Sequence, residues 1–113
     1  MIVGVCRVTL MIGESHSLKE KRMVLRRIKD RVRNKFNVAI AEVGDQDLWQ
    51  SAQLGFAVVA NERGFTQAMV QKVLGFIEDL AVAKVSEDEQ DYVVYGEELE
   101  SSGDVAHWEP DEE

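Results

Sequence analysis

Cysteine, proline and long apolar runs are nearly absent from this chain of 113 residues, which holds one cysteine and one proline. A single cysteine excludes an internal disulfide bond, and disulfide-free chains are typical of reducing compartments. No apolar run reaches the roughly eighteen residues that a membrane-spanning helix needs. Arg7 interrupts the apolar start, and no signal-peptide pattern follows it. These absences predict a cytoplasmic protein with a single domain.

Basic residues are missing from the C-terminal end. Residues 87–113 hold 12 Asp or Glu and no Lys or Arg, a charge of −12. Residues 1–86 hold 13 Lys or Arg and 9 Asp or Glu, a charge of +4, so the overall −8 hides a basic body. We expect a folded domain over residues 1–96 and an acidic C-terminal tail over residues 97–113, either an interaction segment or a solvating one.

The hydrophobic periodicity predicts six elements. The predicted strands cover residues 2–12, 37–43 and 51–60, with a fourth between 82 and 95, and the predicted helices cover residues 17–36 and 66–80. Ser17 and Glu20 have the spacing of a capping box at the start of the first helix. The order β-α-β-β-α-β, with one apolar stripe on each helix, predicts an α+β ferredoxin-like fold: a four-stranded antiparallel sheet with two helices on one face.

The opposite face of this sheet is expected to be apolar. Large exposed apolar patches usually mark interfaces, so self-association, most simply as a dimer, is predicted. The predicted interface residues are Val3, Val5, Met11, Ala39, Ala41, Ala57 and Val59.

The first predicted helix gathers nine of the thirteen cations. Five of them form one stripe along the helix: Lys19, Arg22, Arg26, Lys29 and Arg33. Such a stripe can follow a phosphate backbone, which predicts RNA binding. Two alternatives remain open: a solvated surface without a partner, and a stripe that the acidic tail covers. The outward positions of the two central strands carry no aromatic residue, so base stacking on the sheet is not expected.

No pattern indicates catalysis, and no catalytic residue, metal or cofactor is predicted. Cys6 is expected to be a small buried side chain, and His16 a surface residue. No Cys/His cluster has zinc spacing, and no glycine-rich phosphate loop is present. Glu42, Asp45 and Asp47 are close in sequence and could bind a hard cation, but they do not have the spacing of a calcium loop. Asp47 is expected to cap a turn, and Trp49 to pack over the sheet edge.

Several short motifs resemble the YlxP-like family of small bacterial proteins. They are Ser17-Leu18-Lys19-Glu20-Lys21-Arg22, Phe36-Asn37-Val38, Ala41-Glu42-Val43 and Gln46-Asp47-Leu48-Trp49, and the likeness covers residues 1 to about 86. The resemblance implies a ferredoxin-like domain of unknown function. Family members are often encoded near translation and ribosome-maturation factors, which implies an RNA or ribosome context. It implies no activity, cofactor or catalytic residue.

The sequence therefore predicts a non-catalytic binding protein that contacts RNA or the ribosome through its basic helix. One alternative is a homo-oligomeric interaction or regulatory module that uses the apolar sheet face. A further alternative is a small-molecule enzyme at a dimer interface.

Overall fold

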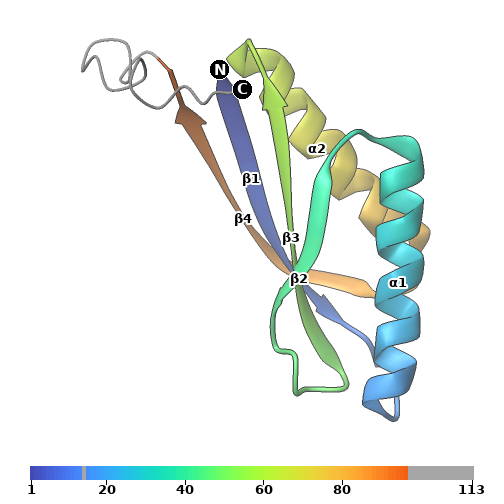
Figure 1. The fold of residues 1–113 in the computed structure, drawn as a ribbon. Helices are drawn as coiled ribbons and strands as arrows, with labels where there is room; N and C mark the ends of the chain where they lie inside the picture. The colour runs from blue at the N-terminus through green and yellow to red at the C-terminus, as the bar shows by residue number, and fades with distance from the viewer. Residues whose placement is uncertain (14, 97–113) are drawn as a thin grey trace, which may run out of the picture.

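The computed structural model describes residues 1–13 and 15–96 (Figure 1). Its elements are β1 (Ile2–Met11), α1 (Leu18–Lys35), β2 (Ala39–Gly44), β3 (Ser51–Ala60), α2 (Arg63–Leu80) and β4 (Lys84–Val94). The strands form one antiparallel sheet in the order β2-β3-β1-β4, and both helices lie on the same face of it. This arrangement confirms the predicted ferredoxin-like fold.

The core lies between the two helices and the inner face of the sheet. Alternate residues of β1 and β3 point into it, among them Cys6, Val8 and Leu10, and they meet Leu25, Ile28 and Val32 of α1 and Val70, Val73 and Ile77 of α2. Because side chains alternate along a strand, the remaining residues of β1 and β3 face outward. The predicted assignment of the two faces is therefore confirmed.

Both helices begin at side-chain caps. Ser17 Oγ accepts a hydrogen bond from the Glu20 amide at 3.1 Å, and the Glu20 carboxylate accepts one from the amide of His16 at 2.6 Å. Glu62 caps α2 by accepting from the Phe65 amide at 2.9 Å, so this helix begins at Arg63, earlier than predicted. The two caps satisfy amides that have no partner within the helices.

The fourth strand, β4, includes the acidic residues 87–91, which had left its limits open in the sequence analysis. Its pairing with β1 shifts register between Thr9 and Leu10 and continues to Val94. Beyond the strand, the Tyr95 amide donates to the Met1 carbonyl at 2.7 Å, which joins the start of β1 to the end of β4. The predicted acidic tail, residues 97–113, lies outside the described residues.

Candidate functional site

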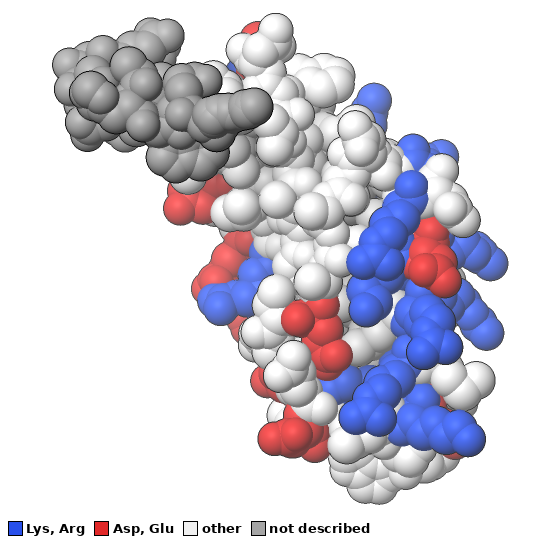
Figure 2. Space-filling view, viewed as in Figure 1, with Lys and Arg blue, Asp and Glu red and all other residues white. Residues whose placement is uncertain are grey.

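The predicted cationic stripe lies on the outward side of α1. Lys19, Arg22, Arg26 and Arg33 are exposed and Lys29 is half-buried. Figure 2 shows that Lys and Arg gather over α1, whereas most Asp and Glu in this view lie on the other side of the molecule. The structure therefore brings the five predicted residues together on one surface.

Few of the α1 cations have an anionic partner. Within residues 1–13 and 15–96, only two of the nine make ion pairs: Lys21 with Glu42, and Arg33 with Asp30 at 4.0 Å. Arg33 also donates to the carbonyl of Ile40 in β2 at 2.8 Å, so its role is partly structural. β2 lies at the edge of the sheet, where unpaired backbone groups invite pairing with another chain. Arg33 occupies one such carbonyl.

Lys21, one of the nine cations of the first predicted helix but not part of the stripe, is buried in the structure. Its side chain is 1% exposed, and its ammonium donates to the carbonyls of Asp45, Leu48 and Ser51 at 2.6, 2.5 and 3.0 Å. Glu42 Oε2 lies 3.2 Å from the same nitrogen. Three carbonyls use all three ammonium hydrogens, so Glu42 compensates the charge.

A sequence signal for this burial existed. On a helical projection at about 100° per residue, Lys21 falls in the middle of the apolar arc that contains Leu25, Ile28 and Val32. A cation at the centre of an apolar stripe requires a buried partner, and Glu42 on the next strand supplies the opposite charge.

The loop between β2 and β3 is held by these bonds. Asp45 has a left-handed backbone with φ of 58°, accepts the Leu48 amide through its carbonyl, and accepts Ser51 Oγ at 2.8 Å through its carboxylate. Asp45, rather than the expected Asp47, thus organises the turn. Trp49 is 46% exposed, and its packing over the sheet edge stays a prediction.

The outer face of the sheet is mostly apolar on β1, β2 and β3, carries carboxylates on β4, and is uncovered by other described residues. All seven predicted interface residues lie on this face, and Val59, Met11 and Val5 are 62%, 44% and 39% exposed. The face is hollowed over the short side chains of Ala39, Ala41, Gly55 and Ala57. The outward positions of β1 and β3 carry no aromatic residue, as the sequence predicted.

The only cysteine is unsuited to nucleophilic chemistry in this setting. Burial, and to a smaller extent the Asp88 carboxylate, raises the pKa of the Cys6 thiol to about 11. Within the described residues, no group of three His, Cys, Asp or Glu side chains could hold a metal ion. In the same part of the chain, no helix is long and apolar enough to cross a membrane.

Comparison with known sequences shows the family. Residues 3–90 match the family model described as "Protein of unknown function (DUF503)". The chain belongs to the DUF503 family. It is also 47% identical over 77 residues to "Uncharacterized protein YlxP" of Bacillus subtilis (strain 168), covering 68% of this chain and 84% of that protein. The match confirms the resemblance found in the sequence, and the motifs of Ser17–Arg22 and Gln46–Trp49 both lie within the DUF503 region.

Solved structures add little to the family assignment. The de novo designed protein Foldit4 superposes with a TM-score of 0.47 at 14% identity, covering 84% of this chain and 98% of that one. A REP-associated tyrosine transposase bound to a REP hairpin gives a TM-score of 0.41 at 12% identity, covering 94% and 68%. Similarities at this level carry no argument about what this DUF503 protein does.

Proposed function

We propose that this DUF503 protein acts by binding rather than by catalysis, and that α1 binds RNA along its phosphate backbone. The observation that carries the proposal is the stripe on the outward surface of α1, where four of the five cations lack an ion-pair partner among the described residues. Lys and Arg at this density attract phosphates and release their counterions. Contacts of this kind carry no base information, so we expect weak sequence preference.

The repulsion among the cations of α1 destabilises the helix, which supports a binding role for this surface. Arg22 and Arg26, Arg27 and Arg31, Lys29 and Arg33, and Arg31 and Lys35 are like-charge pairs at i, i+4. Each such pair destabilises a helix by about 0.2–0.5 kcal/mol. A surface that only had to be soluble would gain from alternating signs instead. A polyanionic partner would relieve the repulsion.

The experiment compares two triple variants with the same loss of charge. One is Lys19→Ala, Arg22→Ala, Arg26→Ala, which removes three residues of the stripe. The control is Arg27→Ala, Arg31→Ala, Lys72→Ala, which removes three exposed cations outside the stripe. We measure binding of a labelled single-stranded RNA by fluorescence anisotropy over a range of salt concentrations, and recovery of ribosomal RNA from lysate.

We expect the stripe variant to bind RNA at least about tenfold more weakly. It should also reduce the slope of log K against log salt by about 2, since each phosphate contact contributes about 0.7 for a single strand. The control should change affinity by a smaller factor. Equal losses of RNA affinity in both variants would mean that binding depends on net charge and not on the stripe. An RNA affinity that the stripe variant leaves unchanged would refute the proposal.

A second candidate function rests on the outer sheet face. Its exposed apolar residues include Val43 on β2, Val59 on β3, Val5 and Met11 on β1, and Val93 at the end of β4. Isolated soluble proteins rarely leave such a surface open. Self-association through this face is compatible with RNA binding by α1, because the helix lies on the other face of the sheet. Sedimentation equilibrium of the wild-type protein tests it.

A further inference from the structure

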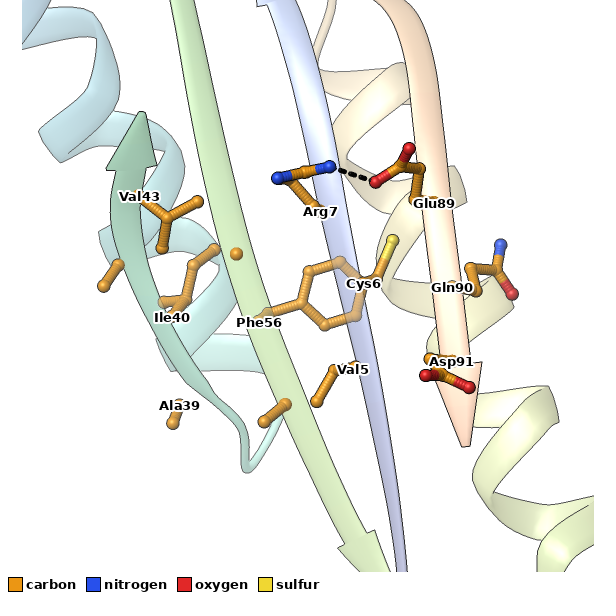
Figure 3. Close-up of a pocket in the computed structure, with 13 residues that line it drawn as sticks. Val5, Cys6, Arg7, Ala39, Ile40, Val43, Phe56, Glu89, Gln90 and Asp91 are labelled. Carbon is orange, nitrogen blue, oxygen red and sulfur yellow. Dashed lines mark hydrogen bonds and ion pairs between the residues drawn. The ribbon is translucent and has the colours of Figure 1, made fainter. Parts of the chain in front are cut away.

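The outer sheet face has two halves that differ in side-chain size (Figure 3). β1 and β4 carry the larger side chains, with Val5 and Arg7 beside Asp91 and Glu89. β2 and β3 carry the smallest: Ala39, Ala41, Gly55 and Ala57. A shallow hollow lies over these small side chains, and its lining extends to Val5 and Arg7 on β1 and to Glu89 and Asp91 on β4. Val43 borders it on β2, where its side chain would be 3.0 Å from a Cβ added to Gly55. The larger side chains of β1 and β4 thus form a ridge along one side of the hollow.

The two halves also differ in charge. The carboxylates of this face lie in one row on β4, at Glu87, Glu89 and Asp91, opposite Thr9, Arg7 and Val5 in the register. Arg7 bonds to Glu89. The small half carries no ionised side chain, but Arg33 reaches its free edge through the Ile40 carbonyl. The acidic row and the basic edge lie on opposite borders of the sheet.

We infer that two copies of this chain pack outer face to outer face around a two-fold axis that runs along the strands. This arrangement lays β4 over the partner's β2 and β1 over the partner's β3. Near the axis, Val5 meets the hollow over the partner's Ala57, and Asp91 approaches the partner's Arg33. The inference rests on the proposed self-association and adds its geometry.

The area fits a second copy. Four strands about 4.8 Å apart and ten residues of about 3.3 Å each give a face of about 600 Å² per partner. That approaches the ~800 Å² per partner of a standard interface, so we expect a concentration-dependent dimer. The acidic tail is a poorer occupant, since it holds 8 Asp or Glu and no Lys or Arg and would meet the acidic row. RNA is disfavoured by the same row.

Side-chain size and charge both disfavour the alternative two-fold axis, which runs across the strands. It would lay β4 over the partner's β4 and bring the three carboxylates against their own copies. It would also lay Val5 against the partner's β1 and leave the two hollows facing each other, unfilled. Only the axis along the strands places the large side chains of one copy over the small side chains of the other, and the acidic row of one copy over the basic edge of the other. A self-complementary surface requires this match.

A size-swap experiment tests the packing. Val5→Ala removes the ridge side chain, and Ala57→Val fills the hollow. Each change occurs twice in a symmetric dimer, so we expect each single variant to raise the dimer Kd by about tenfold or more. The double variant Val5→Ala, Ala57→Val again sets a large side chain against a small one, and should recover most of the affinity. It also preserves the volume of this cross-strand pair within one chain, so the fold is retained.

A cross-linking experiment tests the orientation. In the proposed arrangement Asp91 lies over the partner's Ala39, and facing sheets pack about 10 Å apart, which is too far for a direct disulfide but within reach of a short bis-maleimide. In a Cys6→Ala background, we mix a chain carrying Asp91→Cys with a chain carrying Ala39→Cys and add the bis-maleimide. We expect the mixed cross-linked dimer and little cross-linked dimer of either variant alone.

The outcomes separate the two levels of the proposal. A wild-type protein that sediments as a monomer at millimolar concentration would overturn self-association itself. A dimer that cross-links through Asp91→Cys alone, that fails to give the mixed product, or that the double swap does not restore, would keep self-association and overturn the arrangement. RNA binding is tested at Lys19, Arg22 and Arg26, which the proposed interface does not use, so that measurement is separate from either result.

Discussion

The helices α1 and α2 are both 18 residues long and cover the same face of the same sheet, yet their outward surfaces differ completely. α1 carries nine cations and two carboxylates, a charge of +7. α2 carries Arg63, Lys72, Glu78 and Asp79, a charge of zero. Both helices cover the same face of the sheet, and α2 does so without a net charge. The fold therefore does not require the positive charge of α1. The comparison separates what the scaffold needs from what has been added to it.

The inward surfaces differ as well. α2 buries Thr66, Val70, Val73, Leu74 and Ile77. Thr66 bonds back to the Glu62 carbonyl at 2.8 Å within its own helix. α1 buries an ammonium that bonds to a loop more than twenty residues away. One helix is therefore held mainly by apolar packing, and the other also by a polar contact that fixes the loop between β2 and β3.

The largest expected effect breaks this polar contact. Lys21→Ala leaves the carbonyls of Asp45, Leu48 and Ser51 and the Glu42 carboxylate without their cation. Removing one partner of a buried ion pair costs about 3–5 kcal/mol. The Glu42 side chain is 22% exposed and can be partly hydrated, so we expect a loss at the lower end of that range. Urea denaturation measures the loss in the free energy of unfolding.

The control for this change is Lys19→Ala, two residues earlier on the exposed side, which should stay within about 0.5 kcal/mol of wild type. The double variant Lys21→Met, Glu42→Leu should recover part of the loss, because no charge is then buried alone. Equal stability of Lys21→Ala and Lys19→Ala would mean that the contact contributes nothing to the fold.

Sequence reasoning reached the scaffold but not this contact. Alternation in β1 and the helical periodicity of α1 are local patterns, so they gave the element order and the side of the sheet on which Val5 and Leu10 lie. The position of Lys21 within the apolar arc of α1 signals its burial, but its bonds join the helix to three backbone carbonyls, and carbonyls have no sequence signature.

The free cations of α1 should make its stability depend on salt, whereas α2 should respond little. Four like-charge pairs at i, i+4 cost α1 about 1–2 kcal/mol in total at low ionic strength. Raising the salt from roughly 20 mM to roughly 0.5 M screens exposed charges and should recover up to ~1 kcal/mol of this. Hydrogen exchange of individual amides measures local opening in each helix. Parallel changes in α1 and α2 would show that the charge of α1 does not affect its stability.

The smallest expected effect stabilises α2. Gly75 lies inside this helix, and a Cβ added there would meet no atom within 4 Å. Gly75→Ala should therefore add about 0.5–1 kcal/mol to the free energy of unfolding, since alanine loses less backbone entropy on folding.

Gly4→Ala is the matched change where α2 meets β1: the new Cβ would lie 2.8 Å from Thr66 Cγ2 and 3.1 Å from Val70 Cγ2. It should destabilise the protein by about 1–3 kcal/mol through overpacking. Urea denaturation of both variants should give opposite signs, and a loss of stability in Gly75→Ala would contradict the open space beside that residue.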